Sequence, residues 1–393
     1  MRWDLISCND LTTQTSTSLS EADSLFERGQ TQTVDVEGGQ FRFSFARLSG
    51  GRGDGMDWLE IDNGSFRTIV LPTRGMSLWK AWSKQSELGW QSPVQGPVHP
   101  SCVPIFDPSG LGWLEGFDEL VVRCGLQSNG APDFDVNGKL RYPLHGRIGN
   151  LPAHSLSIFV DPASGTLDVT GSVIEPRFLI QALKLDVRYR FNVKGSTIEC
   201  TDTVTNLRSQ PASMQMLYHM NFGKPLLERG AKLIAALDEI APRNPHAAKD
   251  IDRWDTYSEP TPGYVEQVYF ARPQSDARGW TTSILHNANK TRAVAIGFDT
   301  RTLPYLNLWK NTVAVEDGYV TGLEPATGFP NPRGFEEKQG RLVELAGGHS
   351  RDFTWKIESL DSAASVEQAI EKVHSLSKSA CTVHREPKTG WSS

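Results

Sequence analysis

The residues best suited to acid–base chemistry are a glutamate and two histidines that stand far apart in the chain. Glu324 lies in the segment GLEP, His219 in YHMNFG and His145 in YPLHGR. Each segment places its carboxylate or imidazole close to glycine or proline, as is typical where a rigid sheet presents side chains into a cleft. A carboxylate and an imidazole can together remove and return a proton near neutral pH. These positions therefore predict general acid–base chemistry.

Several well-known catalytic motifs do not occur in the chain. It contains no G-x-S-x-G elbow, no phosphate-binding G-x-x-x-x-G-K-[ST], no H-E-x-x-H and no G-x-G-x-x-G after a predicted strand. None of the nine histidines forms a closely spaced pair of the metal-ligand kind. We therefore expect chemistry that uses neither a metal ion nor an organic cofactor.

Charge and composition restrict the partners of the chain. Its 393 residues include 40 Lys or Arg and 46 Asp or Glu, which gives a formal net charge of −6. Because no Lys/Arg-rich block is present, nucleic acid is not an expected partner. No apolar run is long enough for a membrane span, and the first residues lack the apolar region of a secretory signal. The five scattered cysteines fit reduced thiols, so we expect a cytoplasmic protein without a membrane partner. No oligomeric state is predicted.

Alternation of apolar and polar residues predicts β-strands along most of the chain. The clearest pair is a strand over residues 184–193 that turns at Gly195 into a strand over residues 197–205. Asn63-Gly64 predicts a second hairpin, because this dipeptide tolerates positive φ. Further strands are expected at 41–46, 156–160, 167–173, 293–298, 341–345 and 353–357. This spacing predicts an all-β fold, a large antiparallel β-sandwich with few short helices.

The chain reads as one large domain with two terminal segments. Residues 35–375 contain no linker, repeat or low-complexity tract, so they are expected to form a single domain. Residues 1–34 are expected to be a loosely docked N-terminal extension with a short helix near 20–28. Residues 363–377 predict an amphipathic helix, and residues 376–393 a C-terminal tail.

Three segments in a fixed order carry a family resemblance. They are LHGRIGNLPA at 144–153, LYHMNFGKPLL at 217–227 and GLEPATGFP at 322–330, with Arg74 upstream and Trp309-Lys310 before the last of them. This set resembles the aldose 1-epimerase (galactose mutarotase-like) superfamily, in particular its bacterial branch of aldose 1-epimerase family proteins. The resemblance implies a large antiparallel β-sandwich with a carbohydrate cleft on its concave face, in agreement with the strand pattern.

The resemblance also implies a reaction, the interconversion of the α and β anomers of an aldose or modified sugar. One group removes the proton of the anomeric hydroxyl while another protonates the ring oxygen, so that the ring opens and recloses on the other face. Glu324 would be the base and His219 the acid, on opposite sides of one sugar-sized pocket. The expected sugar-binding residues are His145, Arg74, Arg147, Asn221, Trp309, Lys310 and Asp118.

The substrate is left open, because the segment at His219 reads His-Met-Asn rather than the His-aromatic pattern associated with galactose-acting members. Galactose specificity is therefore not carried over. Arg74, Arg123 and Arg147 could form an anion pocket for a sulfo-, phospho- or uronate sugar.

Two alternatives remain at this stage. The same fold could bind or sense a carbohydrate without turning it over, or it could act as another sugar isomerase or lyase in which Glu324 removes a carbon-bound proton.

Overall fold

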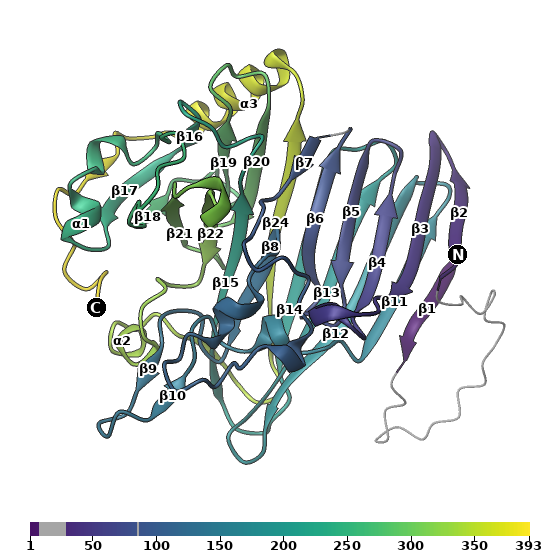
Figure 1. Cartoon of the computed structure of the whole chain (residues 1–393), viewed down its shortest axis with the longest axis horizontal. Coiled ribbons are helices and arrows are strands. Elements are labelled where there is room, and N and C mark those ends of the chain that lie inside the picture. Colours follow the sequence, from purple (N-terminus) through teal and green to yellow (C-terminus); the bar gives the residue numbers. More distant parts are fainter. Residues whose placement is uncertain (8–28, 85) are drawn as a thin grey trace.

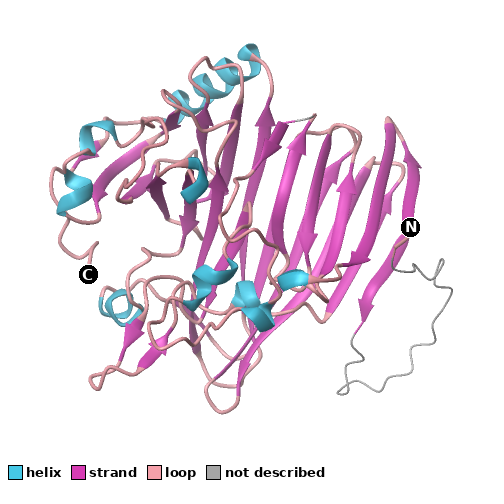
Figure 2. Ribbon diagram, in the orientation of Figure 1, coloured by secondary structure: helices cyan, strands magenta, loops and turns pink. Residues whose placement is uncertain are grey.

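Two large, almost entirely antiparallel sheets pack face to face and confirm the predicted all-β sandwich (Figures 1 and 2). The computed structural model describes residues 1–7, 29–84 and 86–393. The nine-stranded sheet has the order β1 (Arg2–Ser7), β11 (Ser155–Asp161), β12 (Thr166–Arg177), β13 (Gln181–Asn192), β14 (Thr197–Asn206), β24 (Ser350–Leu360), β20 (Ala293–Asp299), β19 (Trp280–His286) and β16 (Lys232–Ala235).

The second sheet has fourteen strands and carries the candidate site. Its order is β2 (Thr31–Val36), β3 (Gly39–Arg47), β4 (Asp57–Asp62), β5 (Phe66–Leu71), β6 (Ser77–Ser83), β8 (Val121–Leu126), β15 (Ala212–Phe222), β22 (Val320–Ala326), β21 (Tyr305–Asn311), β18 (Gln267–Pro273), β17 (Leu237–Pro242) and β25 (Thr382–Val383). Off this path, β7 (Ser86–Leu88) pairs with β6, and β23 (Val343–Leu345) pairs with β15.

Helices are few and short. The α-helices are α1 (Pro245–Ala248), α2 (Arg333–Lys338) and α3 (Ala363–Leu376), and a separate ribbon pairs β9 (Asp133–Phe134) with β10 (Leu140–Tyr142). Short 3-10 helices occupy Gly51–Gly53, Pro100–Cys102, Gly112–Gly116, Ile148–Asn150, Ile251–Arg253 and Val315–Asp317. Among the helices of the described residues, none is long and apolar enough to cross a membrane.

The two hairpins predicted from turn residues are both present, and one side chain joins them. β13 pairs with β14 in the predicted hairpin, and β4 pairs with β5 across Asn63-Gly64. The buried Asn63 amide donates to the backbone carbonyls of Asn192 (2.7 Å) and Gly195 (2.8 Å). Asn63, in a turn of the fourteen-stranded sheet, is therefore hydrogen-bonded to a turn of the nine-stranded sheet. These bonds fix the distance between the two turns.

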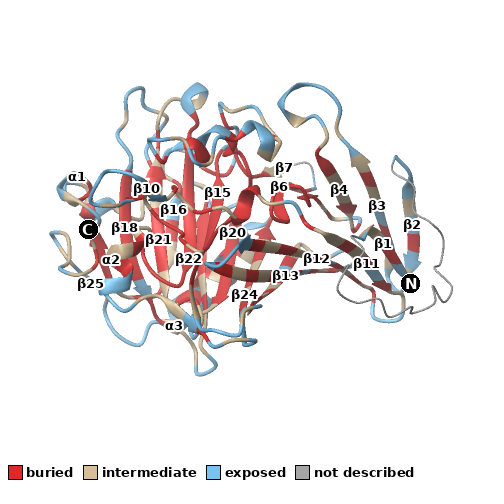
Figure 3. Ribbon diagram, turned by 90° about the horizontal axis from the view of Figure 1, so that it is seen from below, coloured by how far each residue is buried: buried red, intermediate tan, exposed pale blue. Residues whose placement is uncertain are grey.

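Alternate residues of the facing strands fill the core between the sheets. Phe41, Phe43 and Phe45 of β3 and Tyr189 of β13 are buried there, and the central strands β15, β20 and β22 are buried along their length (red in Figure 3). Loops between residues 89 and 153 cover the other face of the fourteen-stranded sheet at its central strands, where Trp113, Phe117 and Leu217 belong to one buried cluster. His219 lies on this covered face, since its neighbours Tyr218 and Met220 belong to the core.

The predicted amphipathic helix is α3, which packs its apolar stripe on the end of the nine-stranded sheet. Val366, Ile370 and Val373 are buried against residues of β19 and β20. Ser362 accepts a hydrogen bond from the backbone N–H of Ser365 and so caps the helix N-terminus.

The terminal segments differ from the sequence expectation, because parts of both lie within the sheets. β1 pairs with β11 over residues 2–7, and β2 belongs to the fourteen-stranded sheet, so residues 1–34 are not simply a loosely docked extension. The expected helix near residues 20–28 lies outside the described residues. In the C-terminal tail, β25 pairs with β17 and Trp391 is buried against Phe329.

Candidate functional site

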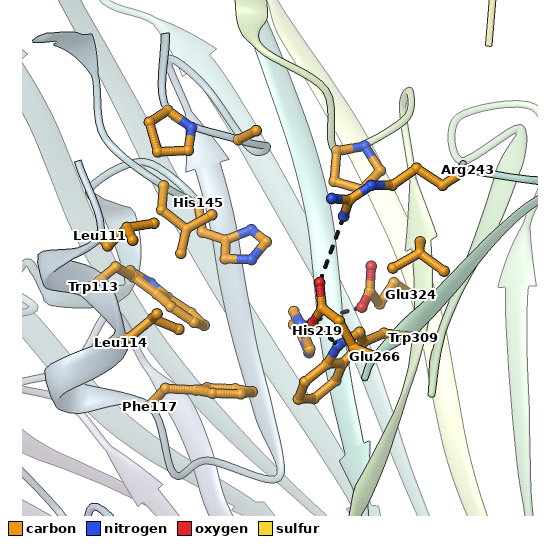
Figure 4. A pocket seen from close by; sticks show the side chains of 15 residues that line it. Leu111, Trp113, Leu114, Phe117, His145, His219, Arg243, Glu266, Trp309 and Glu324 are labelled. Carbon is orange, nitrogen blue, oxygen red and sulfur yellow. Dashed lines mark hydrogen bonds and ion pairs between the residues drawn. The ribbon is translucent and has the colours of Figure 1, made fainter. Parts of the chain in front are cut away.

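Two neighbouring strands bring His219 and Glu324 into direct contact. In the antiparallel pair of β15 and β22, Leu217 lies opposite Ala326 and Met220 opposite Leu323, so this register places His219 across from Glu324. The His219 Nε2 and Glu324 Oε1 atoms are 3.1 Å apart (Figure 4). The expectation that these groups stand on opposite sides of a pocket is therefore wrong. They form one pair on one wall.

A glycine makes room for this pair. Gly322 lies two residues before Glu324 on the same strand, so both positions face the same side of the sheet. A Cβ atom at position 322 would lie 2.8 Å from Oε1 of Glu324 and 3.0 Å from Cε1 of His219. A larger residue there would require the carboxylate or the imidazole to move.

Asn221 fixes which nitrogen of His219 carries a proton. The Asn221 Nδ2 group donates to the backbone carbonyls of Glu119 (2.9 Å) and His219 (3.2 Å), so its Oδ1 atom is the acceptor that lies 2.6 Å from Nδ1 of His219. Nδ1 therefore bears the proton, and Nε2 of a neutral ring presents a lone pair to Glu324. Asn221 is a positioning residue and does not line the cavity.

Burial favours the uncharged form of both members of the pair. Desolvation, with a smaller contribution from the charge of Glu266, raises the pKa of Glu324 to about 8. Desolvation, together with the nearby His145, lowers the pKa of His219 well below its usual value. Near neutral pH the pair thus holds one proton between Oε1 and Nε2, mainly on the carboxyl group.

His145 is the second imidazole at the site. Its Nδ1 donates to the backbone carbonyl of Asn129 (2.9 Å), and burial lowers its pKa to about 4. Its ring is perpendicular to that of His219, with ring centroids 5.3 Å apart and an interplanar angle of 88°. The neutral ring keeps Nε2 free to accept a hydrogen bond from a ligand. Gly146 permits this turn, because a Cβ there would collide with the carbonyl oxygens of Ser128 and Gly125.

These three side chains line a cavity of about 290 Å³ with two unlike walls. Figure 4 shows an apolar wall opposite a charged wall that contains Glu324, and His145 between them. Trp113 packs against His145 at 4.5 Å, and Phe117 packs against His219 at 5.0 Å between ring centroids. The complete lining is Leu111, Trp113, Leu114, Phe117, Ala131, Pro132, Leu144, His145, His219, Arg243, Glu266, Val268, Trp309, Glu324 and Pro330.

An ion pair that the sequence did not indicate lies at the mouth of this cavity. Arg243 follows the end of β17, and Glu266 precedes the start of β18. Their NH1 and Oε1 atoms are 3.8 Å apart, and both side chains are close to half exposed. Glu266 also accepts the indole N–H of Trp309 at 2.6 Å, which fixes the orientation of that ring. Neither charge stands in a motif, so no local signal could have identified them.

The two arginines expected to bind the sugar, Arg74 and Arg147, do not line the cavity. Arg74 is fully buried and pairs with Glu119, with 2.6 Å between NH2 and Oε1, while its NH1 donates to Asn150 at 2.5 Å. Arg147 lies outside the cavity beside Glu175. Arg123 is fully buried and pairs with Asp202. The predicted anion pocket of Arg74, Arg123 and Arg147 is therefore absent, because buried carboxylates hold two of its members in place.

Two further expected binding residues also do not line the cavity. Lys310 points to the opposite side of β21, where Nζ donates to the backbone carbonyls of Arg253 (2.9 Å) and Thr256 (2.8 Å). Asp118 is buried and accepts the indole N–H of Trp79 at 2.8 Å. Of the predicted set, Glu324, His219, His145 and Trp309 line the cavity. Asn221 contacts His219 from outside it.

The described residues hold no group of three or more His, Cys, Asp or Glu side chains that could bind a metal ion. Within the same part of the chain, Cys102, Cys124, Cys200 and Cys381 are free thiols.

The arrangement of the two sheets is a galactose mutarotase-like fold. A sequence profile for a family described as a domain of unknown function, DUF4432, matches residues 53–359, and the chain belongs to this family. It is 31% identical to a candidate aldose 1-epimerase from Klebsiella pneumoniae, with a TM-score of 0.89 over 98% of each chain.

More distant structures share the fold alone. A galactose mutarotase-like protein from Clostridium acetobutylicum is 14% identical, with a TM-score of 0.55 over 81% of this chain and 98% of that chain. A galactose 1-epimerase from Lactobacillus acidophilus is 13% identical, with a TM-score of 0.54 over 81% of this chain and 99% of that chain. No curated protein matches the chain in sequence.

The raised pKa of Glu324 predicts a pH-dependent stability. The folded chain keeps a proton at Glu324 that the unfolded chain releases near pH 4.5, so this contribution is complete below pH 4.5 and is lost as the pH rises through about 8. Thermal unfolding of Glu324→Gln and of the parent chain between about pH 6.5 and 8 should therefore show the variant gaining relative stability. The gain is at most about 1.4 kcal/mol per pH unit. A difference that stays constant over this range would show that Glu324 is ionised in the fold.

Proposed function

We propose that this chain binds a sugar in the cavity and interconverts its α and β anomers. The observation that carries the proposal is the contact between His219 and Glu324, a pair that holds one proton at the wall of a sugar-sized cavity. The similarity to the Klebsiella pneumoniae protein named as a candidate aldose 1-epimerase supports the same assignment.

A pair that shares one proton is suited to ring opening. The anomeric hydroxyl and the ring oxygen are bonded to the same carbon, so adjacent acid and base groups can serve both. The bare Nε2 of His219 accepts the hydroxyl proton while the carboxyl of Glu324 donates to the ring oxygen. The C–O bond of the ring then breaks and the aldehyde forms. Rotation about the adjacent C–C bond and reclosure return both protons.

This assignment reverses the roles expected from the resemblance, in which Glu324 was the base. The two assignments differ only in whether the shared proton is on His219 or on Glu324 before the ring opens. Burial favours the uncharged pair, in which the proton is on Glu324. Ring opening converts it to an imidazolium and a carboxylate 3.1 Å apart, which attract each other.

The remaining walls of the cavity fit one sugar ring. Nε2 of His145 can accept a hydrogen bond from a hydroxyl, since its other nitrogen is occupied by Asn129. Trp113, Phe117 and Trp309 offer ring faces to the C–H groups of the sugar. At the mouth, Arg243 and Glu266 can exchange their loose ion pair for hydrogen bonds to hydroxyl groups distant from the anomeric carbon.

The ion pair of Arg243 and Glu266 should also shift the pKa of Glu324. The negative charge of Glu266 raises the pKa of Glu324, and Arg243 lowers it. Glu266→Gln should therefore move the alkaline limb of the kcat/KM profile to lower pH by about half a unit. It should also raise KM, because a hydroxyl partner is weakened. Glu259→Gln, an exposed glutamate outside the cavity, is the matched control. An unchanged pH profile in Glu266→Gln would show that the ion pair of Arg243 and Glu266 does not affect the catalytic pair.

The proposal is tested by exchange NMR or polarimetry on a panel of aldoses, deoxysugars, uronates and sugar phosphates. For at least one sugar, the anomers should exchange faster in proportion to protein concentration. Saturable binding with exchange at the buffer rate would instead indicate a carbohydrate-binding protein. Incorporation of solvent deuterium at carbon would indicate an isomerase or lyase, because mutarotation exchanges only oxygen-bound protons.

A further inference from the structure

A second hollow, of about 410 Å³, lies on the outer face of the nine-stranded sheet. Its floor is formed by side chains of β13, β14 and β24 that alternate with core residues such as Tyr189 and Cys200, so it faces away from the interior. The candidate active site lies beyond the other sheet. The two hollows therefore have the whole sandwich between them.

The strand register explains why this surface is hollowed. Thr201 of β14 lies between Arg188 of β13 and Thr354 of β24. The two threonines are short and half buried, whereas longer side chains stand around them. Arg188 and Arg190 are two residues apart on one strand and form one edge, since they share its outer face.

An indole forms the opposite edge. Trp280 of β19 lies over Gly297 of the neighbouring strand β20, where a Cβ atom would be 2.8 Å from Cζ2 of the indole. Gly297 is thus the residue that allows the ring to lie close to the sheet. Trp280 lines the hollow, and a flat aromatic surface of this kind suits stacking against a ligand ring.

Most of the positive charges at the rim are held in place by a carboxylate. Arg190 forms two hydrogen bonds of 2.7 Å to Asp168, and Arg301 is bound to Asp299 at 2.6 Å between NH2 and Oδ2. Arg188 differs, because no hydrogen bond or ion pair joins it to the described residues. Its five N–H donors are therefore available to a ligand, beside side chains that are already oriented.

We propose that this hollow binds a small ring compound that carries an oxyanion, such as a phosphate or a carboxylate. Arg188 would bind the oxyanion through paired N–H groups, and Trp280 would stack on the ring. The threonine hydroxyls of the floor would accept or donate further hydrogen bonds. A ligand with several anionic groups is disfavoured, because the carboxylate of Glu199, opposite Arg190, also lines the hollow. This site does not depend on the function proposed for the cavity.

The test is calorimetry on the full chain with AMP, glucose 6-phosphate, glucuronate and inorganic phosphate as probes. At least one ring-bearing anion should bind saturably and more tightly than inorganic phosphate. Arg188→Gln should weaken its binding roughly tenfold or more, because a charge-assisted contact is lost. Trp280→Ala should remove the preference for the ring-bearing probe. Whichever ring anion binds identifies the ligand source as nucleotide, sugar phosphate or uronate.

Two control variants separate this site from other locations. Arg229→Gln removes another exposed arginine, outside the hollow, and should leave binding unchanged. Glu324→Gln alters only the cavity, so binding at the hollow should persist in it, and Arg188→Gln should leave any anomer exchange unaltered. Absence of saturable binding by all probes, or full binding by Arg188→Gln, would overturn the proposal.

Discussion

Glu324→Gln should slow anomer exchange by about 10²–10⁴-fold, the range that positioned acid–base groups contribute. Glutamine has nearly the shape of glutamate and can still donate a hydrogen bond to Nε2 of His219. It cannot supply a proton to the ring oxygen or take one back. The cavity should therefore keep its sugar affinity, and the loss should fall on kcat rather than KM.

The rate is measured by exchange NMR on the best sugar of the panel, beside Glu259→Gln as a control for removing a carboxylate elsewhere. His219→Gln should show a loss of similar size, and the double variant should lose little more than either single one, because the two groups act as a unit. Full activity in Glu324→Gln would exclude this carboxylate from the chemistry. If the double variant instead loses rate by the product of the two single losses, the two groups act independently and do not share a proton.

Arg74→Met should destabilise the fold by about 3–5 kcal/mol, the usual cost of leaving one member of a buried ion pair without its partner. Arg74 and Glu119 are both fully buried, with 2.6 Å between their charged groups. Methionine fills much of the same volume but leaves the Glu119 carboxylate without its cation. Arg229→Met, at an exposed position, should change the stability by less than about 0.5 kcal/mol.

Chemical denaturation of these variants separates two roles for Arg74. From the sequence we expected it to bind the sugar, which predicts that Arg74→Met has a normal stability and a raised KM. The structure makes it a support beneath the loops that cover the cavity, which predicts the loss of stability. The double variant Arg74→Met/Glu119→Gln replaces the unpaired carboxylate by a neutral amide. It should therefore recover part of the lost stability. A stable Arg74→Met with weakened sugar binding would favour the sequence interpretation.

The sequence predicted the layered architecture because local patterns encode it. Alternation over residues 184–193 and the Asn63-Gly64 turn each specify a strand or hairpin within a few residues, and both are present. The amphipathic spacing of residues 363–377 likewise predicted α3. The pairing of β1 with β11 joins residues about 150 positions apart and has no comparable local signal.

The site could be predicted only in part, for the same physical reason. Glu324, His219 and His145 stand in distinctive segments, but whether Glu324 touches His219 depends on the register between β15 and β22. An arginine looks the same in sequence whether it binds a buried carboxylate, as Arg74 binds Glu119, or a ligand. Arg243 and Glu266 became neighbours only through the pairing of β17 with β18.

The protonation state of His219 tests the central claim most directly. With ¹⁵N-labelled histidine, NMR near pH 7 should show Nδ1 protonated and Nε2 without its own proton but hydrogen-bonded. The Nε2 signal should change as the pH rises through about 8, when Glu324 loses its proton, and this change should vanish in Glu324→Gln. If His219 instead titrates near pH 6.5 as an isolated imidazole, unaffected by Glu324→Gln, the two groups do not share a proton and the proposed catalytic pair does not exist.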